Sequence, residues 1–245
     1  MRAKLLLLAL LCSCALPAAA QVPPGVYVTE GGWGTLDVKP GGRNFEIDTV
    51  GANGHVCEMK GTLRGTGPSG TAGTAGSAVG RAETDEKDKP CTIRFTPKDG
   101  GIDVAPGENG ACSYFCGMRA GVAGVYFKPA PGCSPDVVAK GRASFKRLYD
   151  QKAYAQARDT LAPFLERCVK TMVSNEADWI RNDLSITLYR LKDYAGCLKV
   201  LQPLAEQAAM TDAQIKDSLP PFEGEQAVPV ARAARTNLRL CNAGR

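Results

Sequence analysis

Cysteine is the residue type that most constrains what this chain can fold into. The 245-residue sequence holds 10 cysteines and a single histidine. This combination is typical of a disulfide-stabilised exported protein. It argues against a structural zinc site, which needs four thiolate or imidazole ligands in close pairs. We therefore predict no metal and no cofactor, and we expect eight cysteines to form disulfides: Cys57, Cys91, Cys112, Cys116, Cys133, Cys168, Cys197 and Cys241.

The pairing of these cysteines is constrained by their distribution. Five precede residue 134 and three follow it. Odd counts on both sides favour one disulfide between the two halves, the alternative being a free thiol in each half. We expect Cys57 to pair with Cys91, because both lie on strand-like segments, and Cys197 to pair with Cys241, because both lie on neighbouring helices. The remaining four cysteines would then include the bond between the halves.

The beginning of the chain has the form of a secretory signal peptide. A short basic start precedes an apolar run over residues 5–11, and small residues over 15–20 fit an A-x-A cleavage site. The apolar run is too short for a transmembrane helix, and no later segment is long enough. We predict a signal peptide over residues 1–20 and a periplasmic or secreted protein. A lipid anchor at Cys14 is the disfavoured alternative.

The first half of the mature chain has the pattern of antiparallel strands. Short segments with period-2 alternation are separated by glycine and proline, including the turn sequences over 39–42 and 98–101. For residues 21–133 we predict a small, disulfide-stabilised antiparallel β barrel or sandwich. The expected strands cover residues 32–38, 45–50, 56–63, 92–95, 102–104 and 122–127.

Two segments of this half have no strong strand pattern. Residues 64–80 are rich in glycine and lack large apolar side chains before Val79, so we expect a loop or a weak strand there. The glycine spacing does not match a phosphate-binding loop. Residues 81–90 form a charge run, which we expect to be a solvated hairpin tip.

The second half, residues 134–245, is rich in leucine and alanine and predicts helices. Ser134 before Pro135 has the form of a helix start, and residues 211–214 have the form of a capping box. Residues 138–245 carry 17 basic and 12 acidic side chains, spread at helical spacing. A nucleic-acid surface would need clustered basic residues with aromatic platforms, so we predict no nucleic-acid partner.

A sequence echo divides this half into similar units. Residues 148–155 recur forty positions later as residues 188–195, and the match continues through Leu161 with Leu201 and Pro163 with Pro203. A fixed-period echo of this kind indicates stacked helix pairs. The terminal helical segment around residues 228–241 would be a cap or a partial third unit.

The segment YRLKDYAGCLKVL, residues 189–201, resembles the turn and second helix of a tetratricopeptide repeat. The departures are Lys152 and Lys192 in place of the usual turn glycine, and a period of forty in place of about 34 residues. The resemblance implies a helical scaffold that binds peptides or partner proteins in a groove, without catalysis. It implies packing roles for Tyr154, Tyr194, Leu161, Leu201, Leu184, Cys197 and Ala157.

An active site is hard to assemble from this sequence. His55 is the single histidine, and we interpret it as a turn or strand residue because no G-x-S-x-G motif accompanies it. Glycoside hydrolysis needs two carboxylates. The residues Glu46, Asp48, Glu58 and Asp103 lie on strand-like segments, but the pattern singles out no pair. We predict that the protein is not an enzyme.

These observations favour an exported, non-enzymatic α+β protein of two domains that binds or scaffolds protein partners in a bacterial-type envelope. The alternative is an inhibitor of lysozyme or another cell-wall hydrolase, since the β half is loosely similar in size, compartment and disulfide content to small periplasmic lysozyme inhibitors. A second alternative is a carboxylate-based glycan hydrolase.

Overall fold

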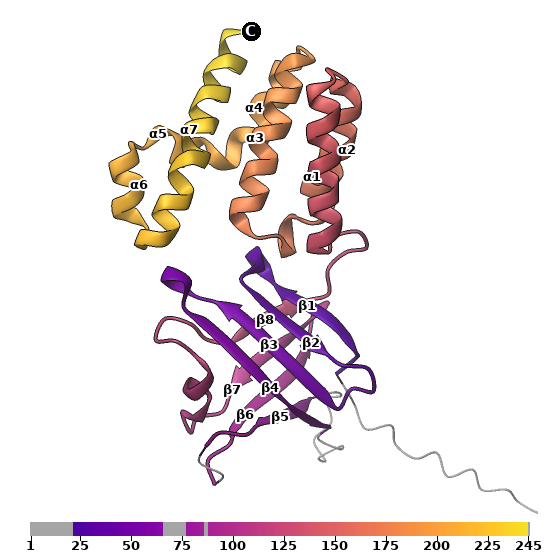
Figure 1. Ribbon diagram of the computed structural model, residues 1–245, viewed down its shortest axis with the longest axis vertical. Coiled ribbons are helices and arrows are strands. Elements are labelled where there is room, and N and C mark those ends of the chain that lie inside the picture. The colour runs from indigo at the N-terminus through magenta and orange to yellow at the C-terminus, as the bar shows by residue number, and fades with distance from the viewer. Residues whose placement is uncertain (1–21, 66–76, 86–87, 245) are drawn as a thin grey trace, which may run out of the picture.

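The computed structural model describes residues 22–65, 77–85 and 88–244. It has an N-terminal β-barrel and a C-terminal helical region, and Figure 1 shows the helices standing on one end of the barrel. The expected signal peptide over residues 1–20 and the alternative anchor at Cys14 lie outside the described residues.

Eight strands form a closed antiparallel barrel in sequence order, and β1 pairs with β8 to close it. The antiparallel β prediction is confirmed, and a barrel is present instead of a sandwich. The turn over 39–42 is as expected, with positive φ at Gly41 and Gly42. The strands are β1 Gly25–Thr29, β2 Gly34–Val38, β3 Asn44–Val50, β4 Val56–Gly65, β5 Ala78–Ala82, β6 Cys91–Lys98, β7 Gly101–Pro106 and β8 Gly124–Phe127.

Two strands differ from the sequence prediction. Strand β1 was not predicted. Strand β5 begins in the segment for which a loop or a weak strand was expected and ends in the segment expected to be a charged hairpin tip. The small residues of β5 have a packing reason. A Cβ at Gly80 would lie 2.6 Å from the Phe95 ring and 2.8 Å from the Phe45 ring. Because these rings fill the interior, β5 needs small residues where it faces them, and it therefore lacks the usual apolar alternation.

The barrel interior is packed with side chains. Phe45 and Phe95 meet edge to face, with ring centroids 5.1 Å apart. Tyr126 is fully buried, and its hydroxyl donates to the carbonyl oxygen of Val122 at 2.9 Å. Burial raises the pKa of the Tyr126 phenol. The other large, fully buried barrel side chains include Leu36, Ile47, Met59 and Ile93.

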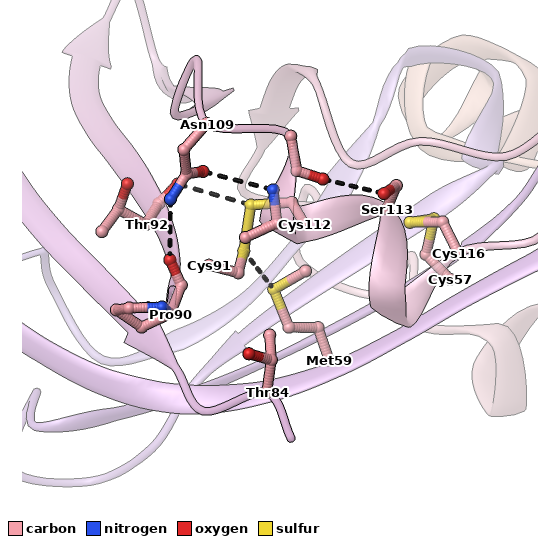
Figure 2. Close-up of a disulfide and its surroundings, with 12 residues drawn as sticks. Cys57, Met59, Thr84, Pro90, Cys91, Thr92, Asn109, Cys112, Ser113 and Cys116 are labelled. Carbon is pink, nitrogen blue, oxygen red and sulfur yellow. Dashed lines mark hydrogen bonds between the residues drawn. A yellow bond between two sulfur atoms is a disulfide. The ribbon is translucent and has the colours of Figure 1, made fainter. Parts of the chain in front are cut away.

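Two disulfides fasten the segment between β7 and β8 onto the barrel. Cys91 pairs with Cys112, and Cys57 pairs with Cys116. Figure 2 shows both bonds around the short helix η3 (Ala111–Phe115), with Asn109 donating to the carbonyl oxygen of Pro90 at 3.1 Å. The expected Cys57–Cys91 pair was wrong, because β4 and β6 lie on either side of β5 and each cysteine faces η3 instead.

The other two disulfides lie in the helical region. Cys197 pairs with Cys241, as expected, and Cys133 pairs with Cys168. Cys133 precedes the first helix in the chain, but its side chain packs in the helical core with Val138 and Phe164. The expected disulfide between a cysteine before residue 134 and one after it is therefore present, as Cys133–Cys168. It does not fasten the barrel itself to the helices, because Cys133 packs in the helical core.

The helical region begins where the sequence predicted. Pro135 is the first residue of α1, although the Ser134 side chain makes no capping hydrogen bond. The capping box at Thr211 is confirmed, with Thr211 Oγ1 accepting from the Gln214 amide at 3.2 Å. The helices are α1 Pro135–Asp150, α2 Tyr154–Arg167, α3 Ser174–Arg190, α4 Tyr194–Leu201, α5 Ala205–Ala209, α6 Asp212–Ser218 and α7 Pro221–Ala243.

The two turns within the sequence echo have the same conformation. Lys152 and Lys192 both adopt the left-handed region, with φ of 61° and 62°. Each donates its backbone N–H to the carbonyl oxygen of the tyrosine three residues earlier, at 2.9 and 3.0 Å. The following tyrosine, Tyr154 or Tyr194, packs against that same tyrosine. The echoed leucines Leu161 and Leu201 are fully buried.

No helix within residues 22–65, 77–85 and 88–244 is long and apolar enough to cross a membrane. The four disulfides are consistent with an extracellular or periplasmic protein.

Glycine at either turn lysine should stabilise the protein. The left-handed conformation costs a side-chain-bearing residue roughly 1–2 kcal/mol, and glycine relieves this cost while adding unfolded-state entropy. We expect Lys152→Gly and Lys192→Gly each to raise the free energy of unfolding in urea by about 0.5–1 kcal/mol. The control, Lys140→Gly in the interior of α1, should lower it by about 1 kcal/mol. A loss of stability at both turns would contradict the prediction.

Candidate functional site

The barrel meets the helical region through two loops at one end. The first is the short helix η1 (Glu30–Gly32), which lies against the residues that precede α3. Gly32 has a φ of 69°, and a Cβ at this position would lie 2.5 Å from the backbone nitrogen of Val173. Two independent features therefore require glycine at position 32: the left-handed backbone conformation, and the close contact with the backbone of Val173.

The second loop is the short helix η2 (Ala52–Gly54), which contacts the N-terminus of α7. Asn53, in the left-handed region with a φ of 56°, donates its backbone N–H to Glu223 Oε1 at 2.9 Å. Its side-chain oxygen accepts from the backbone N–H of Phe222 at 3.4 Å. The residue before α7, Pro220, offers no capping side chain. The barrel thus supplies the cap, in an arrangement resembling a capping box divided between two parts of the fold.

A third contact joins the last strand to the helical region. Lys170, in the short helix η4 (Val169–Thr171), places its ammonium group 3.4 Å from the centroid of the Phe127 ring. This distance is within the range of a cation–π interaction. Together the three contacts hold the end of the barrel against α3 and α7.

Beside these contacts an open pocket of about 640 Å³ lies between the two parts. Binding sites for small molecules usually have volumes of about 300–1,000 Å³. Four large apolar side chains on its wall remain well exposed, at 39% for Trp33, 53% for Val50, 50% for Val173 and 54% for Phe222. The other lining residues are Gly31, Gly32, Gly51, Ala52, Ser174, Asn175, Asp178, Gln207, Leu219, Pro220, Glu223, Gln226, Ala227 and Val230.

The pocket is acidic. Asp178 and Glu223 line it, and among residues 22–65, 77–85 and 88–244 no lysine or arginine does. Asp178 pairs with Arg181 at 2.9 Å, and burial raises the pKa of the Asp178 carboxyl although Arg181 opposes the shift. Glu223 Oε2 is buried and has no hydrogen-bond partner within the described part of the chain. The two carboxyl groups therefore differ, since one has a cationic partner and the other has none.

A buried polar network supports the helical wall of the pocket. The Asn182 side-chain amide donates to the carbonyl oxygens of Asp178 and Val230, both at 3.2 Å. Asn237 donates to the hydroxyl of Ser185 at 2.9 Å. Because these bonds join α3 to α7, they fix the relative positions of two residues that line the pocket.

The carboxylates considered from the sequence lie on the barrel and do not line this pocket. Asp48 and Glu58 are cross-strand partners, both exposed, beside a depression of about 290 Å³ that also contacts Trp33. Hydrogen bonds from Lys39 and Lys60 lower the pKa of Glu46. Asp103 lies on β7 and pairs in register with Val125.

The histidine occupies a turn position. His55 follows η2 at the start of β4, and its ring packs against Gly117, where an added Cβ would lie 2.7 Å from Nδ1. Within the residues that the structure describes, no group of three or more His, Cys, Asp or Glu side chains is arranged to hold a metal ion.

Sequence reasoning missed the pocket residues Trp33, Asp178, Phe222 and Glu223. Comparisons with protein-family models, curated proteins and solved structures found no match to this chain.

A substitution at Gly32 should disturb the junction specifically. We expect Gly32→Ala to lower the free energy of unfolding by about 2 kcal/mol or more, because it adds a backbone clash to the conformational cost. Gly41→Ala is the matched control, since Gly41 also has a positive φ but an added Cβ would meet nothing within 4 Å. The control should cost about 1–2 kcal/mol.

The emission of Trp33 provides a second measurement for this pair. In a Trp179→Phe background, Trp33 is the single tryptophan of the chain. Gly32→Ala should shift its emission to longer wavelength, because the ring becomes more hydrated, and Gly41→Ala should not. Equal effects of both substitutions on stability and emission would contradict the junction described above.

The raised pKa of Asp178 predicts a pH dependence of stability. The folded chain binds this proton more tightly than the unfolded chain, so protonation stabilises the fold. The contribution is fully present below the ordinary pKa of 3.8 and is lost as the pH rises through the folded value. We expect the unfolding free energy of the wild type, relative to Asp178→Asn, to decrease over that interval in urea titrations. A constant difference would contradict this assignment.

Proposed function

We propose that this protein is an exported, non-enzymatic binding protein that holds a segment of a partner protein in the pocket between the barrel and the helices. The observation that carries the proposal is the gathering of Trp33, Val50, Val173 and Phe222 around one cavity. Folding normally buries such side chains, and a cluster of exposed ones is characteristic of interaction sites.

The helical region supports a protein or peptide as the partner. The resemblance of residues 189–201 to a tetratricopeptide repeat implies peptide binding, and the matching turns at Lys152 and Lys192 support that resemblance. The pocket also has the mixed wall that a peptide segment requires, because the side-chain amides of Asn175 and Gln226 stand beside the apolar residues. Export to the periplasm or beyond is supported by the disulfides and by the leader-like start of the sequence.

Binding is a better explanation of the pocket than glycan hydrolysis. A glycosidase acid needs a site that shields it from water and raises its pKa. The cross-strand pair of Asp48 and Glu58 is solvent-exposed on the outside of the barrel. In the pocket, burial raises the pKa of Asp178, but this carboxylate is paired with Arg181, and one oxygen of Glu223 accepts from the Asn53 amide.

A second candidate function is inhibition of a cell-wall hydrolase such as lysozyme. The segment around η3 presents Tyr114 and Met118, which are 55% and 94% exposed. Two disulfides, at Cys112 and Cys116, hold this segment at both ends of η3. A protruding segment held in this way loses little entropy on entering the cleft of an enzyme.

Selection of random peptides on the purified protein tests the main proposal. We expect selected peptides to shift the emission of Trp33 to shorter wavelength in the Trp179→Phe background. Phe222→Ser should weaken their binding by about tenfold or more, because truncating a central aromatic side chain removes a large part of the contact energy. Val26→Ser is the control, since Val26 is 50% exposed on β1 and does not line the pocket.

Peptides that bind equally well to Phe222→Ser would overturn the proposal. Inhibition of lysozyme in a cell-wall turbidity assay, abolished by Tyr114→Ser or Met118→Ser and unaffected by Phe222→Ser, would establish the second candidate function instead.

A further inference from the structure

We propose that the pocket selects segments that carry a positive charge, and that Glu223 recognises an ammonium group such as that of a lysine side chain flanked by apolar residues. This inference rests on the proposed function and names the chemistry of its ligand.

The charge balance of the pocket is the first argument. Within the described part of the chain, its lining includes two carboxylates and no cationic side chain. Asp178 is compensated by Arg181 at 2.9 Å, with both side chains largely buried. Glu223 has one neutral partner, the backbone amide of Asn53 at 2.9 Å. The uncompensated charge of the pocket is therefore on Glu223.

The unpaired oxygen of Glu223 is the second argument. Its Oε2 is buried and has no hydrogen-bond partner in the described part of the structure. A buried carboxylate oxygen without a partner is costly, and natural proteins rarely leave one without a functional reason. A cationic donor from a ligand satisfies both the hydrogen-bonding capacity and the charge. Because the oxygen is covered, a donor reaches it through a small displacement of the pocket rim, where Phe222 is exposed.

The aromatic residues of the pocket fit the same ligand. Trp33 and Phe222 both line it and are 39% and 54% exposed. An ammonium group is attracted to the face of an aromatic ring, and the methylene groups of a lysine side chain pack well on apolar surface. Leu219 and Val173 provide such surface beside the rings. An anionic segment would meet the uncompensated carboxylate of Glu223 there and should be excluded.

Glu223 can be neutralised without disturbing the junction. In Glu223→Gln the amide oxygen still accepts from the Asn53 N–H, so the bond at the start of α7 is retained. The matched control is Glu225→Gln, which removes the same charge from the same helix. Glu225 is an exposed residue that pairs with Lys216 at 2.6 Å and does not line the pocket.

The test uses three peptides, acetyl-Leu-Xaa-Leu-amide with lysine, norleucine or glutamate at Xaa, titrated against the Trp179→Phe protein with Trp33 emission as the readout. We expect the lysine peptide to bind about tenfold more tightly than the norleucine peptide, as for one hydrogen bond to a charged group. The glutamate peptide should bind most weakly. Glu223→Gln should reduce the lysine preference to less than about twofold, and Glu225→Gln should leave it unchanged.

The outcomes separate this inference from the proposed function. Equal binding of all three peptides, weakened in each case by Phe222→Ser, would overturn the charge selection and leave the pocket as a binding site. A lysine preference that persists in Glu223→Gln would overturn the role of Glu223. If no peptide changes the Trp33 emission, both proposals fail. If Glu223→Gln does not fold, the relative affinities of the three peptides for the Trp179→Phe protein, which retains Glu223, still test the charge selection.

Discussion

The candidate site depends on the exchange of hydrogen bonds between Asn53 and the first turn of α7. The side chain of Asn53, in the barrel loop η2, caps helix α7, whose own N-cap residue has no capping side chain. In return, Glu223 of α7 accepts a hydrogen bond from the backbone N–H of Asn53. The backbone of Gly32 presses against Val173 at the other side of the pocket. These contacts set the separation of the two walls, so the pocket is a property of the junction and belongs to neither part alone.

Three residues of the pocket contribute less to the stability of the fold than their side chains could. Trp33 and Phe222 leave large apolar surfaces in water, and Glu223 has a buried oxygen with no hydrogen-bond partner among the residues that the structure describes. Burying these rings and pairing this oxygen would each favour the folded state. Where local choices conflict with stability, a functional cause is the usual explanation. Elsewhere the side chains agree with the fold, as the packed rings of Phe45 and Phe95 illustrate.

The sequence predicted the kinds of elements better than their pairing. Alternation and turn glycines located most strands because each signal is local, whereas β5 lacks large apolar residues since the rings of Phe45 and Phe95 occupy the space in front of Gly80. Cys197 and Cys241 could be paired from helix neighbours, but the partner of Cys57 depends on how the segment around η3 folds back over the barrel. The pocket could not be predicted, because Trp33 and Glu223 come from distant parts of the sequence.

The disulfides are divided equally between the two parts of the fold. Two of the four lie within the barrel and its η3 segment, and two lie within the helical region. Each contributes about 2–4 kcal/mol to its own part, whereas a typical hydrogen bond contributes about 1 kcal/mol. The junction is held by the bonds of Asn53, the packing of Gly32 and the contact of Lys170 with Phe127. None of these four disulfides crosses the junction, so the contacts that hold its two sides together are noncovalent. A ligand that contacts both walls stabilises the junction directly, by an amount that grows with its concentration relative to its Kd.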